Sequence, residues 1–152
     1  MGKTIILTGS PTRFGEDHFT EDNGLLAAVK TALADAMAAR LGKKVPEGDE
    51  MRQMKPRVLM VSAAPDDRGF TEYVLESMTE CIRKSGIEPA AVTMLDRRNA
   101  DSAEALVRSA DWIVLCGGHV PTQNRFLHEI RLKELLKDFN GLVMGCSAGS
   151  MN

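Results

Sequence analysis

Residues 111–149 have the sequence DWIVLCGGHVPTQNRFLHEIRLKELLKDFNGLVMGCSAG, and this stretch decides the fold. Two apolar runs, 111–118 and 141–145, flank a stretch with helical spacing over 124–139. Runs that are apolar throughout, without alternation, are typical of strands buried on both faces. The stretch therefore predicts strand, helix and strand, with the helix packed on the sheet.

The same alternation runs through the rest of the chain. Apolar runs rich in β-branched residues predict three further strands, and helical periodicity or alanine-rich composition predicts three further helices. The predicted strands are 4–8, 57–65 and 90–95, the predicted helices are 25–42, 70–86 and 101–110, and an exposed connector is predicted at 43–56. This order favours one α/β domain over residues 1–152, with three α/β/α layers around a mostly parallel sheet.

Composition restricts the classes of function. The chain has 152 residues and a net charge of −2 with acids and bases mixed, so neither nucleic acid nor an anionic membrane is favoured as a partner. No apolar run is long enough to span a bilayer, and the first residues lack a signal-peptide pattern. The three cysteines form no C-x-x-C pair, so neither a disulfide framework nor a metal site is predicted. We expect a cytoplasmic protein with reduced thiols.

The turn at 145–149 is the strongest candidate for chemistry. Its residues, Gly-Cys-Ser-Ala-Gly, match the G-x-S-x-G pattern, in which a nucleophile sits on a tight turn between strand and helix. The flanking glycines let the backbone fold tightly around the serine. Two interpretations stay open: Ser147 is a nucleophile, or it is an ordinary turn serine at a glycine-rich strand exit.

A second glycine motif, Gly117-Gly118, ends the preceding strand. If the two strands are neighbours in the sheet, this loop lies over the serine turn. The loop amides and the amide of Ala148 could then form the two halves of an oxyanion hole. The pair is equally compatible with a flexible strand exit.

Together, the two motifs resemble the dipeptidase E and cyanophycinase family of serine peptidases. The resemblance implies the flavodoxin-like sheet of the class I glutamine-amidotransferase-like superfamily. It also implies that Ser147 is the nucleophile, that the amides of Gly118 and Ala148 bind the oxyanion, and that the substrate is a small peptide or isopeptide, often with aspartate on the acyl side. We further expect Gly117, His119 and Asn124 to contact substrate.

This sequence departs from the family pattern in two ways. His119 stands where dipeptidases commonly carry asparagine, which puts aspartyl specificity in question. The family also takes its histidine and acidic partner from sequence after the nucleophile, beyond residue 152. We therefore expect these residues to be the N-terminal portion of a longer catalytic domain, inactive alone and prone to self-association or dimerisation. A natural short form without catalysis is the alternative.

Serine needs a base to become a strong nucleophile, and His119 is the histidine nearest the predicted site. His18 and His128 are expected to be solvated, and Asp66 and Asp67 to act as helix caps or surface charges. Two other functions stay open. One is a non-catalytic ligand-binding module on the same scaffold, and the other is an anion site in the loop 8–12. No dinucleotide or Walker motif occurs, so no cofactor is predicted.

Overall fold

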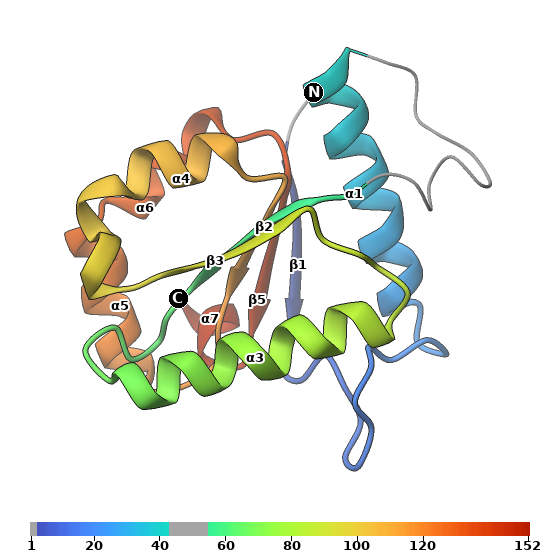
Figure 1. Cartoon of the computed structure of the whole chain (residues 1–152), viewed down its shortest axis with the longest axis horizontal. Coiled ribbons are helices and arrows are strands. Elements are labelled where there is room, and N and C mark those ends of the chain that lie inside the picture. The colour runs from blue at the N-terminus through green and yellow to red at the C-terminus, as the bar shows by residue number, and fades with distance from the viewer. Residues whose placement is uncertain (1–2, 43–54) are drawn as a thin grey trace.

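The computed structural model describes residues 3–42 and 55–152, which form a five-stranded, all-parallel sheet (Figure 1). The strand order is β1-β5-β4-β2-β3. The strands are β1 (Thr4–Thr8), β2 (Arg57–Val61), β3 (Ala91–Leu95), β4 (Trp112–Leu115) and β5 (Leu142–Cys146). The predicted α/β fold with a mostly parallel sheet is confirmed, and the observed sheet is parallel throughout, so all five strands end at one edge.

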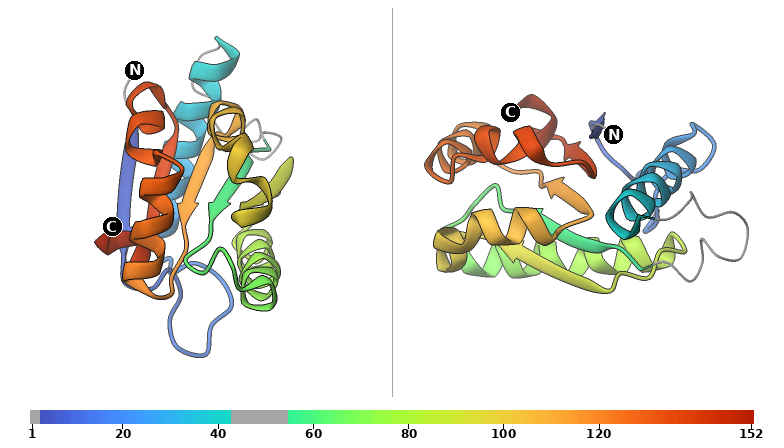
Figure 2. Two further views of the ribbon diagram at one scale, coloured as in Figure 1. Left: turned by 90° about the vertical axis from the view of Figure 1, so that its left-hand side faces the viewer. Right: turned by 90° about the horizontal axis from the view of Figure 1, so that it is seen from above.

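Helices cover both faces of this sheet. The helices are α1 (Leu25–Leu41), α3 (Arg68–Lys84), α4 (Ala103–Ser109), α5 (Val120–Glu129), α6 (Leu132–Leu135) and α7 (Ala148–Met151), with 3-10 turns at Arg97–Ser102 and Leu136–Asp138. The right-hand view of Figure 2 shows α4, α5 and α6 on one side of the strands and α1 on the other.

Each face of the sheet has its own apolar core. In β4, for example, Trp112 and Val114 pack in the core that includes α1 and α3, whereas Ile113 and Leu115 pack in the core that includes α4 and α5. Successive side chains of a strand point to opposite faces, so a strand between two helical layers must be apolar at every position. This requirement explains the continuous apolar runs of the sequence.

Two predicted strands end earlier than expected. β2 stops at Val61, since the hydroxyl of Ser62 accepts a hydrogen bond from the Ala64 N–H at 3.0 Å and turns the chain. β4 stops at Leu115, and the glycine pair lies in the loop that follows. The connector predicted at 43–56 lies, for residues 43–54, outside the described residues.

The prediction of one helix over 124–139 is wrong. α5 begins earlier, at Val120, with Pro121 in its first turn, where the missing N–H costs nothing. The helix is then interrupted at Arg131, whose backbone is left-handed (φ 56°, ψ 43°), and α6 starts after it. The apolar periodicity continues through the break, so it could not reveal the interruption.

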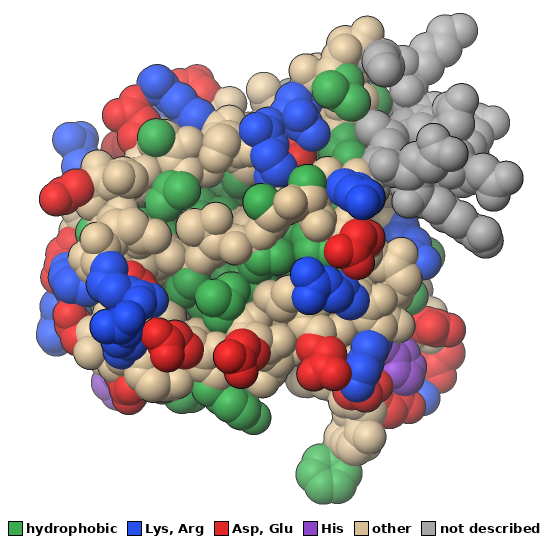
Figure 3. Space-filling view, viewed as in Figure 1, with side chains coloured by type: hydrophobic (Ala, Val, Ile, Leu, Met, Phe, Trp, Pro, Cys, Tyr) green, Lys and Arg blue, Asp and Glu red, His purple; other side chains and the backbone are tan. Residues whose placement is uncertain are grey.

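On the face that Figure 3 displays, the charged side chains are not segregated by sign, and lysine and arginine side chains are interspersed with acidic ones. Within residues 3–42 and 55–152, none of the helices combines the length and hydropathy needed to cross a bilayer.

Candidate active site

Ser147 occupies a sharp corner between β5 and α7. Its backbone has φ 51° and ψ −113°, a conformation that is costly for any residue with a side chain. The corner is fixed by a 2.9 Å hydrogen bond from the Ser147 N–H to the carbonyl oxygen of Thr8, at the end of neighbouring β1. The serine itself is exposed at the carboxyl edge of the sheet. A strained, exposed serine is the arrangement that a nucleophilic turn requires.

The glycines on either side of Ser147 are required by close backbone contacts. A Cβ at Gly145 would lie 2.7 Å from the carbonyl oxygen of Gly149. A Cβ at Gly149 would lie 2.1 Å from the carbonyl oxygen of Leu115, in β4. Both separations are far below van der Waals contact, so the turn closes only with glycine at these two positions. The G-x-S-x-G pattern is therefore built into the geometry of the turn.

The glycine loop after β4 lies against this corner. β4 and β5 are neighbours in the sheet, with Leu115 paired to Gly145. The loop after β4 and the serine turn after β5 therefore lie side by side. A Cβ at Gly117 would lie 3.3 Å from the Cβ of Ser147 and 3.9 Å from its hydroxyl oxygen. At Gly118 a Cβ would clash with Ala63, at 2.7 Å. The loop is thus confined between the Ser147 turn and the end of β2.

Two backbone amides at the site have no acceptor within the protein. Across the described part of the chain, neither the N–H of Gly118 nor that of Ala148 donates a hydrogen bond to a protein group. Backbone N–H groups without an acceptor in the protein are the kind of donor that can bind a developing negative charge. The structure thus leaves both predicted oxyanion donors available.

Sequence reasoning missed a polar bridge behind the site, made by Gln123 and Asn152. Gln123 is fully buried, and its side-chain amide donates to the carbonyl oxygen of Cys116 at 2.8 Å. The side-chain nitrogen of Asn152 lies 3.2 Å from the Gln123 side-chain oxygen and 3.2 Å from the carbonyl oxygen of Ala148. Gln123 lies three residues before buried Phe126, so the two share the apolar face of α5. A polar residue at such a position was the sequence signal that could have revealed the bridge.

None of the three histidines is bonded to Ser147. His119 is the residue before α5, and its Nδ1 lies 2.7 Å from the Thr122 hydroxyl, a contact within its own helix turn. His18 lies beside Glu16 and Asp17, and His128 is exposed on α5. Within the described ranges, no side chain hydrogen-bonds the Ser147 hydroxyl. Asn124 is exposed on α5 and likewise makes no hydrogen bond to Ser147.

The acids at this edge of the sheet have structural partners. Asp67 caps α3 by accepting a hydrogen bond from the Phe70 N–H at 3.1 Å, as the sequence predicts. Asp66 accepts hydrogen bonds from Arg97, which lower the pKa of the carboxyl. Arg97 also pairs with Glu129 and lies over the ring of Phe126, 5.3 Å from its centre. These carboxylates hold loops and helices together.

The cysteines are unsuited to act as nucleophiles. Burial raises the pKa of the Cys146 thiol to about 12, so this neighbour of Ser147 stays protonated at neutral pH. Burial likewise raises the pKa of Cys116 to about 12 and that of Cys81 to about 11. All three are free and buried. The described residues contain no cluster of three or more histidine, cysteine or acidic side chains arranged to hold a metal ion.

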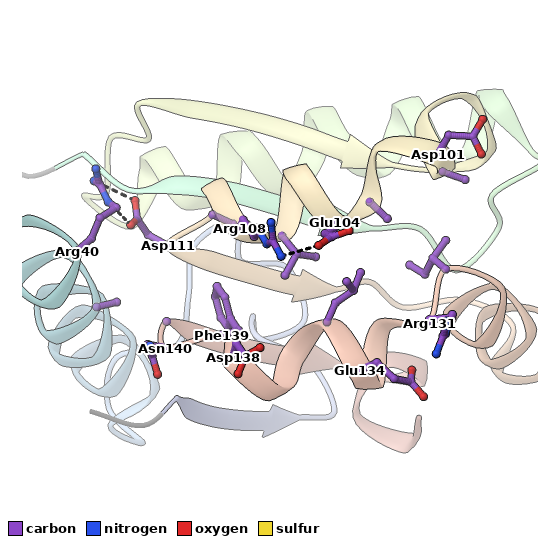
Figure 4. A pocket seen from close by; sticks show the side chains of 18 of the residues that line it. Arg40, Asp101, Glu104, Arg108, Asp111, Arg131, Glu134, Asp138, Phe139 and Asn140 are labelled. Carbon is purple, nitrogen blue, oxygen red and sulfur yellow. Dashed lines mark hydrogen bonds and ion pairs between the residues drawn. The ribbon is translucent and has the colours of Figure 1, made fainter.

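A cavity of about 690 Å³ lies away from the serine, between the end of α1 and the helices α4 and α6 (Figure 4). Two ion pairs lie in its wall: Arg40 Nε binds Asp111 at 2.6 Å, and Arg108 binds Glu104 at 2.6 Å. The residues that line the cavity do not include Ser147.

The loop 8–12 uses its own hydroxyl groups. Thr8 donates to the carbonyl oxygen of Ser10 at 2.9 Å, and Ser10 donates to that of Thr12 at 2.8 Å. Hydroxyls engaged in the loop are not free to cradle an anion, which disfavours the phosphate-site alternative.

Comparison with models of known protein families finds none that matches this chain. Comparison with curated proteins finds no match either.

Proposed function

We propose that this chain carries the nucleophile and oxyanion hole of a serine hydrolase of the dipeptidase E type, on a flavodoxin-like, glutamine-amidotransferase-like scaffold. The observation that carries the proposal is the backbone of Ser147. A non-glycine residue at φ 51° and ψ −113° stores strain, and such strain persists where a function requires it. The Gly117-Gly118 loop, which lies beside Ser147, supports the same interpretation.

The reaction is acyl transfer from a small peptide or isopeptide. The Ser147 oxygen attacks the amide carbonyl while a base takes the hydroxyl proton, and the carbonyl oxygen becomes an oxyanion. The amides of Gly118 and Ala148 stabilise that charge, which is typically worth a factor of about 10² to 10³ in rate for each donor. The C–N bond then breaks, the amine leaves with a proton, and water releases the acyl group from Ser147.

The residues described here do not supply the base. In the family that the two motifs resemble, the histidine comes from sequence after the nucleophile, so the test is made on the full-length gene product. That protein is treated with a fluorophosphonate probe, and the labelled peptide is identified by mass spectrometry. We expect labelling at Ser147, its loss in Ser147→Ala, and its retention in Ser77→Ala, an exposed serine on α3. A folded protein that stays unlabelled contradicts the proposal.

A second function, ligand binding without catalysis, is favoured because, among the described residues, no histidine hydrogen-bonds the Ser147 hydroxyl. Titration calorimetry of the full-length protein with an aspartyl dipeptide, followed by product analysis, distinguishes the two functions. Saturable binding without hydrolysis supports the binding module, whereas turnover supports the hydrolase.

A further inference from the structure

The two presumed oxyanion donors belong to different segments. Gly118 lies in the loop after β4, and Ala148 begins α7 after β5. Catalysis by two donors depends on their separation, because hydrogen bonds to a developing charge weaken steeply with distance and angle. Something must therefore hold the loop and the short helix in a fixed relation.

Gln123 holds the loop. Its side-chain amide donates to the carbonyl oxygen of Cys116 at 2.8 Å, and Gln123 is fully buried. That carbonyl forms one plane with the N–H of Gly117, so fixing it sets the direction in which the Gly117-Gly118 segment leaves the strand. Cys116 lies just past the end of β4. Its N–H still donates to the carbonyl oxygen of Val61 in β2, at 3.1 Å, whereas its own carbonyl oxygen is held by Gln123.

Asn152 connects this bond to α7. Its side-chain nitrogen lies 3.2 Å from three acceptors: the side-chain oxygen of Gln123 and the carbonyl oxygens of Val120 and Ala148. An amide nitrogen has only two hydrogens, so the three contacts share them. The result is a continuous bridge from Cys116 through Gln123 and Asn152 to Ala148.

We infer that Gln123 and Asn152 are positioning residues that set the separation of the Gly118 and Ala148 amides beside Ser147. This inference rests on the proposed function, since only a reaction through an oxyanion needs that separation. A buried glutamine that merely satisfied the Cys116 carbonyl would stabilise the fold without affecting turnover selectively. The two roles therefore differ in what their loss does to kcat.

The experiment uses the full-length protein with Gln123→Met, Asn152→Ala and the control Ser85→Ala. Methionine keeps the length of glutamine but removes its donor. Ser85 is 5% exposed and bonds the Phe19 N–H at 2.8 Å, so it is a buried polar residue at the opposite end of α3 from the site. The readouts are the melting temperature, the second-order rate of fluorophosphonate labelling at Ser147, and kcat and KM for p-nitrophenyl acetate.

We expect Gln123→Met to lower the labelling rate and kcat by about 10- to 100-fold, with KM changed by less than about threefold. Asn152→Ala should lower kcat by about three- to tenfold, because the bond from Gln123 to Cys116 remains. Ser85→Ala should lower the melting temperature and leave both rates within about twofold of the wild type.

Three results would overturn the inference. The first is a folded Gln123→Met protein with wild-type rates, and the second is an equal loss of rate in Ser85→Ala. If Gln123→Met does not fold, the Asn152→Ala variant decides, and wild-type rates in that variant are the third result. A labelled wild type with unaffected variants refutes only the positioning role, whereas an unlabelled wild type refutes the hydrolase itself.

Discussion

The Cα of Gly149 lies so close to β4 that a Cβ there would be 2.1 Å from the carbonyl oxygen of Leu115. The contact joins α7, the helix after Ser147, to β4, the strand before the Gly117-Gly118 loop. It therefore fixes α7 over the end of the sheet, and with it the direction in which the Ser147 side chain leaves the turn.

This contact predicts a severe effect of Gly149→Ala. The added methyl group meets the Leu115 carbonyl group, which cannot move without shifting β4. The variant should therefore lose at least about 3 kcal/mol of stability. Gly9→Ala is the matched control, because a Cβ at Gly9 meets nothing within 4 Å. Urea denaturation measures both. Equal stabilities of the two variants would show that the turn is looser than the structure indicates.

The backbone of Ser147 leads to a second prediction. At φ 51° and ψ −113° a side chain is strained, and glycine relieves the strain. Ser147→Gly should therefore be more stable than Ser147→Ala by about 1 kcal/mol or more, although both lack the hydroxyl. Thermal denaturation of the two variants side by side tests this. An alanine variant as stable as the glycine variant would mean that the corner is relaxed.

The sequence predicts the elements well where their residues are buried on both faces. The central strands β2, β4 and β5 were recognisable as continuous apolar runs, since helices on both sides exclude polar side chains. The edge strand β1 has the same kind of sequence, but Ile5 and Leu7 are exposed, so an apolar run alone did not show that a strand is buried on both faces. The order of the strands could not be read in this way, because pairing depends on contacts between distant segments. The site depends on β4 and β5 being neighbours, and the sequence alone allowed this to be assumed but not predicted.

Two features of the site region could not be predicted for physical reasons. Arg131 is left-handed although arginine does not favour that backbone, and the packing on either side of it imposes the break. Gln123 is buried because its amide meets the Cys116 carbonyl, a relation that appears only once α5 is placed against the end of β4. Neither the break at Arg131 nor the hydrogen-bond partner of Gln123 can be read from a local sequence pattern.

The buried thiols predict a loss of stability at alkaline pH. Burial raises the pKa of Cys116 and Cys146 from 9.0 to about 12, so the folded state keeps their protons longer than the unfolded state does. The stability should be unaffected by these groups below pH 9 and should fall between pH 9 and 12, by up to about 1.4 kcal/mol per pH unit for each thiol. Urea denaturation midpoints determined from pH 8 to 10.5 measure how steeply the stability falls with pH.

Cys146→Ala provides the control for this prediction. The variant should lose less stability than the wild type over the same pH range, because one of the titrating thiols is gone. The comparison cancels the contribution of lysines and other surface groups. Parallel curves for the two proteins would contradict a titrating thiol at this position.

Asp111 joins three elements at the opposite edge of the sheet. The carboxylate is 2% exposed and accepts hydrogen bonds from Arg40 Nε at 2.6 Å and from the Arg57 N–H at 2.8 Å (Figure 4). Asp111→Asn should lower the free energy of unfolding by about 1 to 3 kcal/mol, less than for a fully buried pair, because Arg40 is one-third exposed. Asp101→Asn, at an exposed acid of the same cavity, should change it by less than about 0.5 kcal/mol. Similar losses of unfolding free energy in the two variants would show that the buried Asp111 carboxylate stabilises the fold no more than an exposed acid does.

The edge strand β1 predicts self-association. In the described part of the chain β1 pairs only with β5, and Ile5 and Leu7 are 58% and 62% exposed. An edge with free backbone groups and apolar side chains favours pairing with another copy. A buried leucine contributes about 1.5 to 3 kcal/mol, so Leu7→Lys should weaken association by about tenfold or more in sedimentation velocity. Tyr73→Lys, at a 67% exposed residue on α3, should leave association unchanged. Equal weakening by both substitutions would mean that association does not involve the β1 edge.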